Sequence, residues 1–397
     1  MILDVKFKNL LITALTIFSF VSCKAQTAKA DCFKTGADRP ELYLPLLQNK
    51  TIGVVTNQTG LMNDQTHLVD FLVASKVKVK SIFAPEHGFR GNADAGEHVK
   101  NGVDTKTGVP IVSLYGNNKK PTKQQLQGID VVLFDIQDVG VRFYTYISTL
   151  TYVMEAAAEN GIEVMVLDRP NPHDGYIDGP VLKNKWKSFV GMHNVPVVYG
   201  LTIGEYGKMV NGEKWLQKGL TANYTLIPMQ GYNKNSRYEI SERPSPNLPN
   251  DVSINLYPSL CFFEGTQVSV GRGTELPFQI YGSPWTKGLP YQFTPRPNYG
   301  AKDPFLNGKT CYGENLSNYT TDLRKLNLEW LLKSYKAYKN PQQNFFLSNL
   351  FFDKLAGTDE LRKQIIAGET EQEIRDSWKA DLEKYSAIRA KYIVYED

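Results

Sequence analysis

The chain has 397 residues, a formal net charge of +4 and 22% charged residues. This charge is too small, and the Lys and Arg residues are too scattered, to indicate a nucleic-acid-binding protein. The length exceeds that of one ordinary hydrophobic core, so we expect a soluble globular protein with two domains or subdomains.

The N-terminus has the pattern of an export signal. Two lysines precede an apolar run over residues 10–21. About a dozen apolar residues are too few to span a membrane but have the length of a signal-peptide core. Cys23 follows and is a candidate lipidation site, while cleavage near Ala25 or Ala30 is the alternative. We therefore predict a signal peptide over 1–22 and an exported protein, either periplasmic or a membrane-anchored lipoprotein, without a membrane-spanning segment in the mature chain.

The first half of the chain alternates strand and helix signals. Apolar runs of strand length predict buried strands, and an apolar spacing of three and four residues predicts helices. The predicted strands are 50–60, 77–84, 129–140 and 162–172, and the predicted helices are 67–75 and 145–161, the second ending at Gly161. Alternating strands and helices indicate a parallel sheet covered by helices, an α/β fold.

The second half has a different pattern. Residues 228–310 are rich in Pro, Gly, Asn and Tyr, and only 266–270 resembles a short strand. From about residue 326 the spacing becomes helical, and Thr370 with Glu373 fits a helix capping box. We place the α/β domain at 33–235 and a smaller α+β subdomain at 236–397.

Polar clusters follow each predicted strand of the first half. They are Thr56–Thr59, Pro85–Gly88, Asp135–Asp138 and Asp168–Pro172. In parallel sheets the ligand crevice lies at the carboxyl ends of the strands, so we expect these clusters to converge there.

Several kinds of site lack their motifs in this chain. There is no GxGxxG opening a helix, no GxxxxGK[ST] and no GxSxG, which argues against a dinucleotide site, a phosphate loop and a serine hydrolase. The chain has five His and no HExxH or CxxC pair, so a metal site is not predicted.

Catalysis by carboxyl groups fits the polar clusters better than a nucleotide, serine hydrolase or metal site does. Glycoside hydrolysis needs a carboxylic acid that protonates the leaving oxygen and, in most enzymes, a second carboxylate. Glu86 is the best candidate acid because it ends a strand beside a histidine and near an arginine. Glu264 and Glu275 are the candidates for the second group, whereas Glu205 lies in a capping box with Thr202 and more simply starts a helix.

Longer blocks of the chain resemble a known family. "FAPEHGFRG", "VPIVSLYG", "VVLFDIQDVGVRFYTYISTL", "VLDRPNP", "GLTIGE", "YPSLCFFEGT" and "VGRGTELPF" resemble the exo-β-N-acetylmuramidases (NamZ-like), from about residue 40 to the C-terminus. The resemblance implies a Rossmann-like, mostly parallel sheet with helices on both faces, a smaller second subdomain and a cleft between them. It implies a glycoside hydrolase that removes N-acetylmuramic acid from the non-reducing end of peptidoglycan fragments, with no nucleotide or metal cofactor.

The resemblance also nominates site residues. The motif "PEHG" assigns Glu86 a catalytic role, and we choose Glu264 over Glu275 as its partner because it lies in the longer block. The arginines would pair with the lactyl carboxylate of the muramyl sugar. The candidate substrate-binding residues are His87, Arg90, Asp135, Gln137, Arg142, Tyr144, Asp168, Arg169, Asn171, Arg272 and Glu275.

Two other functions are compatible with the sequence. An exported solute-binding protein for muramyl sugars would have a similar composition and crevice, but it would not need two carboxylates. A hydrolase of amide or ester links in the same cell-wall fragments is the third interpretation, and the missing nucleophile motif argues against it.

Overall fold

The first half of the chain forms a seven-stranded sheet. The computed structural model describes residues 33–90, 101–235, 238 and 240–396. The strands are β1 (Thr51–Thr56), β2 (Lys78–Ala84), β3 (Gly102–Val103), β4 (Pro110–Ser113), β5 (Val131–Asp135), β6 (Glu163–Leu167) and β7 (Asn223–Ile227). Their order is β3-β4-β2-β1-β5-β6-β7, and every pair is parallel except β3 with β4. The predicted α/β fold with a mostly parallel sheet is therefore confirmed.

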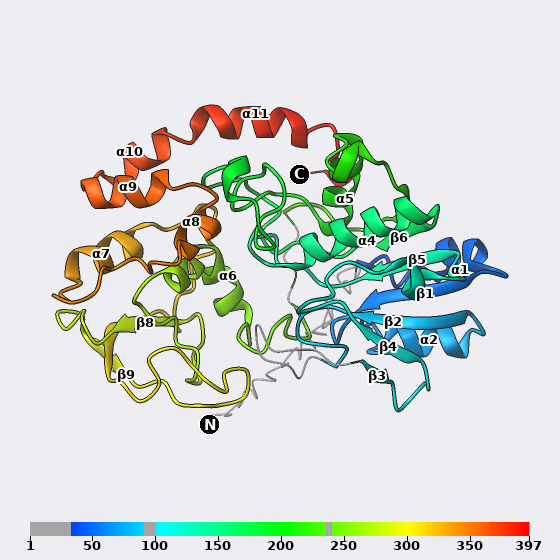
Figure 1. The fold of residues 1–397 in the computed structure, drawn as a ribbon, viewed down its shortest axis with the longest axis horizontal. Helices are drawn as coiled ribbons and strands as arrows, with labels where there is room; N and C mark the ends of the chain where they lie inside the picture. The colour runs from blue at the N-terminus through cyan, green and yellow to red at the C-terminus, as the bar shows by residue number, and fades with distance from the viewer. Residues whose placement is uncertain (1–32, 91–100, 236–237, 239, 397) are drawn as a thin grey trace, which may run out of the picture. The chain divides into compact units, whose positions relative to one another are not determined.

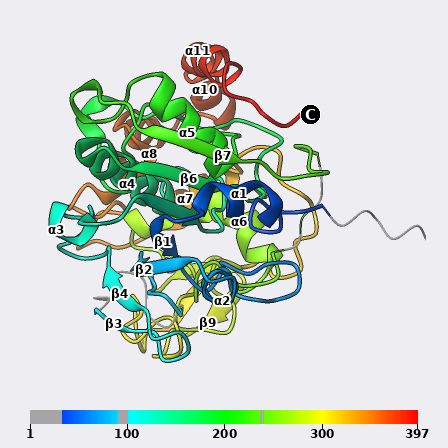
Figure 2. The ribbon, with the colours of Figure 1, turned by 90° about the vertical axis from the view of Figure 1, so that its right-hand side faces the viewer.

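Helices cover both faces of this sheet (Figures 1 and 2). They are α1 (Pro40–Leu47), α2 (Leu68–Ala74), the short α3 (Lys123–Leu126), α4 (Tyr146–Asn160) and α5 (Ile203–Gly212). Neighbouring strand residues point to opposite faces, so Val131 and Leu133 pack in one core with α1 and α2, whereas Val132 and Phe134 pack in another with α4 and α5. This alternation buries the strands on both faces and explains their nearly continuous apolar sequences.

Helix ends follow their sequence signals. Gly161 ends α4 in the left-handed conformation with a φ of 67°, as its position after the helix predicted. The hydroxyl groups of Thr202 and Thr370 cap α5 and the C-terminal helix α10 (Glu371–Asp376) in complete capping boxes with Glu205 and Glu373.

The C-terminal part carries a small antiparallel sheet and a series of helices. Its strands β8 (Ile280–Ser283), β9 (Tyr291–Phe293) and β10 (Cys311–Asn315) lie in the order β8-β10-β9. The helices are α6 (Asp251–Leu260), α7 (Glu329–Ala337), α8 (Phe351–Ala356), α9 (Glu360–Ala367), α10 (Glu371–Asp376) and α11 (Lys379–Arg389). Short 3₁₀ turns cover Asn184–Trp186, Gln217–Gly219 and Cys261–Gly265.

The predicted strand at 266–270 is wrong. Thr266 and Ser269 make only isolated bridges, to Phe346 and Gly282, because the partner segments run beside this stretch for a single residue each. The hydrophobic core continues from α4 and α5 into the C-terminal helices, so residues 33–397 form one compact unit. Among the described residues, no helix has the length and apolar character needed to cross a membrane.

Candidate active site

A cavity of about 830 Å³ is lined by residues from both halves of the chain, among them carboxylate and aromatic side chains. Five of the predicted site residues line it: Glu86, His87, Tyr144, Glu264 and Arg272. Its size suits a sugar or a short oligosaccharide. The predicted cleft between the Rossmann-like sheet and the C-terminal part therefore has a physical counterpart at this cavity.

Glu86 reaches the cavity through a tight turn at the end of β2. His87 and Gly88 both have left-handed backbones, with φ of 69° and 77°, and the Gly88 amide donates to the Pro85 carbonyl at 3.0 Å. A left-handed conformation is uncommon for a residue with a side chain and often marks a functional turn. The turn stops the strand and places the Glu86 carboxyl group between the hydroxyl groups of Tyr115 and Thr145, which donate to it at 2.7 and 2.8 Å.

Glu264 lies in the 3₁₀ turn that follows α6 and faces a cation. The Nε of Arg272 donates to its carboxylate at 2.7 Å, and the guanidinium lies 5.0 Å from the centre of the Phe278 ring. The thiol of Cys261 lies 3.5 Å from the other carboxylate oxygen. Burial, and then the charge of Glu264, raises the pKa of this thiol well above its usual value, so Cys261 remains a neutral thiol and not a nucleophile.

The two carboxyl groups have partners of different kinds. Hydroxyl groups both donate and accept hydrogen bonds, so Tyr115 and Thr145 suit Glu86 with or without a proton. A guanidinium only donates, so Arg272 suits Glu264 as a carboxylate. This pairing allows one group to transfer a proton while the other stays negatively charged, which is the division of roles that glycoside hydrolysis uses.

Most of the other predicted site residues form internal bonds and do not line this cavity. Asp135 and Arg169 make a buried two-point ion pair, with contacts of 2.5 and 2.9 Å. Arg142 is fully buried and donates to the carbonyl groups of Pro180, Val195 and Leu355, and burial lowers its pKa to about 9.

The remaining placements follow the same pattern. The Gln137 side chain donates hydrogen bonds to the Asp138 and Pro170 carbonyl groups, and the Asn171 side-chain amide donates one to the Leu201 carbonyl. Arg90 forms an ion pair with Asp104. Glu275 differs from these residues because it is exposed to solvent. Gln137 and Arg169 instead border a separate cavity of about 140 Å³. The expected convergence of the strand ends occurs, but neighbouring strands place these polar groups close enough to bond one another and the loops that cover them.

The structure adds cavity residues that sequence analysis missed. Among them are Tyr115, Thr145, Phe189, Lys302 and Asp303, which have polar or aromatic side chains. Tyr115 and Thr145 lie inside the family blocks "VPIVSLYG" and "VVLFDIQDVGVRFYTYISTL", which was the available signal.

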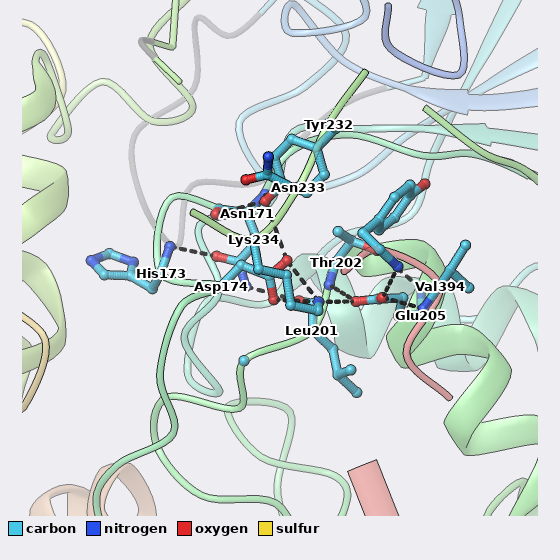
Figure 3. Close-up of polar contacts among 12 residues, drawn as sticks. Asn171, His173, Asp174, Leu201, Thr202, Glu205, Tyr232, Asn233, Lys234 and Val394 are labelled. Atoms are coloured by element: carbon cyan, nitrogen blue, oxygen red, sulfur yellow. Dashed lines mark hydrogen bonds and ion pairs between the residues drawn. The ribbon is translucent and has the colours of Figure 1, made fainter. Parts of the chain in front are cut away.

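Asp168 belongs to a buried polar network that includes residues near the C-terminus. Its carboxyl group accepts from the hydroxyl groups of Thr202 and Tyr395, both at 2.7 Å, and from the Gly204 amide at 2.9 Å. In the neighbouring part of this network, the Glu205 carboxylate accepts a hydrogen bond from the Val394 amide at 2.7 Å (Figure 3). The network therefore fixes the last residues of the chain against the start of α5.

Replacing Asp168 with Asn should remove part of the pH dependence of stability. Burial, with a smaller contribution from the charge of Glu205, raises the pKa of Asp168 to about 7 from a usual 3.8. Between these values the folded state binds more protons than the unfolded state, so this group stabilises the fold at low pH and loses that effect as the pH rises to 7. The slope is about 1.4 kcal/mol per pH unit for one proton.

Urea unfolding of both proteins from pH 4.5 to 7.5 measures this effect. The difference between the two curves isolates Asp168, because the other buried titratable groups are present in both proteins and their contributions cancel. Asp138 and Asp174, whose pKa values burial raises to about 6, act in the same direction as Asp168, whereas His193, whose pKa burial lowers to about 3, acts in the opposite direction. The free energy of unfolding of the wild type should fall relative to Asp168→Asn as the pH rises. Parallel curves would show that Asp168 is ionised in the folded protein throughout.

Comparisons with known proteins agree with this architecture. The sequence models described as exo-β-N-acetylmuramidase NamZ, N-terminal and C-terminal, match residues 52–252 and 255–395. The peptidoglycan β-N-acetylmuramidase NamZ of Bacillus subtilis (strain 168) is 39% identical over 396 residues, covering 94% of each chain.

Two crystal structures of DUF1343 family proteins from Bacteroides fragilis NCTC 9343 also match. One has a TM-score of 0.84 and 44% sequence identity, and the other has a TM-score of 0.77 and 29% identity. Each match covers 92% of this chain and 99% of the chain in the matching crystal structure. The chain, with both of its halves, belongs to the exo-β-N-acetylmuramidase NamZ family.

Proposed function

We propose that this protein is an exo-acting β-N-acetylmuramidase, a glycoside hydrolase that releases terminal N-acetylmuramic acid from the non-reducing end of peptidoglycan fragments. Its similarity to the Bacillus subtilis enzyme over 94% of both chains supports this activity. The observation that carries the proposal is the pair of carboxyl groups, Glu86 and Glu264, lining one sugar-sized cavity. A solute-binding protein has no need of such a pair.

The geometry supports an acid-assisted reaction. Glu86 donates its proton to the glycosidic oxygen as the bond to the anomeric carbon breaks, so the remaining sugar leaves as an alcohol. The carboxylate of Glu264 stabilises the positive charge that develops on the muramyl ring. Water then adds to the anomeric carbon, and its proton returns to Glu86, which restores the enzyme and yields free N-acetylmuramic acid.

The cavity also suits an anionic sugar. N-acetylmuramic acid differs from N-acetylglucosamine by a lactyl group that ends in a carboxylate. Of the described residues that line the cavity, Arg272 and Lys302 are the Arg and Lys side chains that could pair with this carboxylate. Of the four arginines that sequence analysis considered for this role, only Arg272 lines the cavity among the described residues, whereas Arg90, Arg142 and Arg169 do not.

A release assay tests the proposed function. The protein is incubated with a disaccharide that has N-acetylmuramic acid at the non-reducing end, and separately with one that has N-acetylglucosamine at that end. Mass spectrometry should detect free N-acetylmuramic acid from the first substrate and no cleavage of the second. Binding without cleavage of the first disaccharide would favour the solute-binding function, and equal cleavage of both would contradict the end specificity.

We also propose that the protein is exported and lipidated at Cys23. The support is the apolar run at 10–21 ahead of this cysteine. Both lie outside the described residues. In cell fractionation, the wild type should appear with membranes and Cys23→Ala in the soluble periplasmic fraction. The same distribution for both proteins would contradict lipidation.

A further inference from the structure

We propose that Tyr115 and Thr145 are positioning residues for Glu86, which hold its carboxyl group in the orientation needed for proton transfer. The proposal rests on the glycosidase function given above and adds two residues to its machinery. The Tyr115 hydroxyl donates to one carboxyl oxygen, Oε1, at 2.7 Å. The Thr145 hydroxyl donates to the other, Oε2, at 2.8 Å. Both distances are those of good O–H···O hydrogen bonds.

The two bonds come from opposite sides of β2 in the sheet, because β4 precedes β2 in the strand order and β5, which leads to Thr145, follows it. Tyr115 follows β4, the strand next to β2 on the outer side, and Thr145 directly precedes α4. Two bonds to two different oxygens fix both the position of a planar carboxyl group and the orientation of its plane. A single bond would leave the carboxyl group free to rotate about the bond that joins it to the side chain.

Thr145 departs from the usual role of threonine at a helix start. Thr122, Thr202 and Thr370 all cap their helices, with the hydroxyl group accepting from a backbone amide. Thr145 occupies the same position before α4, but its hydroxyl makes no cap bond. It donates to Glu86 instead. The helix thus lacks a stabilising cap at the place where the catalytic carboxyl group is bound, which is expected when function rather than local stability determines a side chain's contact.

Tyr115 is held in place by its surroundings. Its ring lies 6.4 Å from the Phe189 ring, measured between centres, and both rings line the cavity. Its backbone amide donates to the Ser113 hydroxyl, and the Asn118 side chain donates to the Ser113 carbonyl. These contacts order the loop after β4, so that the phenol oxygen reaches Glu86 from a defined direction.

The positioning role predicts an effect on turnover rather than on substrate binding. A misplaced acid slows proton transfer but leaves the contacts that bind the sugar unchanged. Tyr115→Phe and Thr145→Val should each lower kcat about tenfold, the size expected for losing a hydrogen bond to a group that becomes charged. KM should change less than about twofold. Thr145→Ser keeps the hydroxyl and should restore most of kcat.

The experiment measures kcat, KM and melting temperature for these variants on the muramyl disaccharide, in the wild-type and Glu86→Gln backgrounds. In the Glu86→Gln background, Tyr115→Phe should cause little further loss of residual turnover, because both changes act through the same group. Thr145→Val removes no helix cap, so the melting temperature should stay close to that of the wild type.

Three results would overturn the proposal while leaving the glycosidase function intact. They are an unchanged kcat in Tyr115→Phe and Thr145→Val, a raised KM at constant kcat, or a Thr145→Ser variant as slow as Thr145→Val. A wild type that does not cleave the disaccharide would instead overturn the proposed function. If Thr145→Val fails to fold, Tyr115→Phe and Thr145→Ser still decide the question.

Discussion

Glu86→Gln should lower kcat by about 10²- to 10⁴-fold on the muramyl disaccharide. The glutamine has nearly the same shape and can bond the hydroxyl groups of Tyr115 and Thr145, but it has no proton to give to the glycosidic oxygen. The substrate should therefore bind with an affinity close to that of the wild type. Product release followed by mass spectrometry, together with calorimetric titration of the disaccharide, measures the two effects separately.

Glu275→Gln is the matched control for this variant. Glu275 was the alternative second carboxylate, and it is exposed and does not line the cavity. It should retain wild-type kcat. Full turnover by Glu86→Gln would remove Glu86 from the mechanism, and loss of activity in both variants would show that the effect is not specific to the cavity.

Lys234→Met should lower the free energy of unfolding by about 3–5 kcal/mol. The ammonium group has no exposure to solvent and donates to both oxygens of Asp174 at 2.9 Å and to Glu205 at 2.7 Å (Figure 3). Without it, two buried carboxyl groups lose their counter-charge. Burial already raises the pKa of Asp174 to about 6, so one of them would take up a proton at a cost in stability.

Urea unfolding at pH 7 measures this loss. Lys391→Met is the control, because Lys391 pairs with Glu213 at 3.0 Å at the surface, where such pairs contribute about 1 kcal/mol or less. Glu205, which loses its cation in Lys234→Met, also accepts a hydrogen bond from the Val394 amide, so the C-terminal residues should become more sensitive to carboxypeptidase in this variant. Equal stability of the two variants would show that the buried cation is not needed.

The fold was largely predictable because its strongest signals are local. The central strands β1, β5 and β6 are buried on both faces, and α4 has a clear apolar spacing with a glycine stop. Most of the strands that sequence analysis missed are short or lie at the edge of their sheet; β10 is an exception, with five residues between β8 and β9. β7 has only one buried residue, so its sequence has no apolar run to detect.

The candidate site was only partly predictable. A polar residue at a strand end can face a cavity, as Glu86 does, or bond the neighbouring strand, as Asp135 does with Arg169. The choice depends on strand order and on the loops that cover the sheet, which no local pattern encodes. Tyr115 and Thr145 were missed because a single hydroxyl residue has no motif, and their common partner is distant in sequence.

The most direct test of the account is a crystal structure of Glu86→Gln with the muramyl disaccharide bound. The account predicts that the non-reducing muramyl ring lies in the cavity of about 830 Å³, between residues 86 and 264. The glycosidic oxygen should lie within about 2.6–3.2 Å of the residue 86 side chain. A disaccharide bound elsewhere, or bound with the glycosidic oxygen out of reach of both residues, would contradict the account.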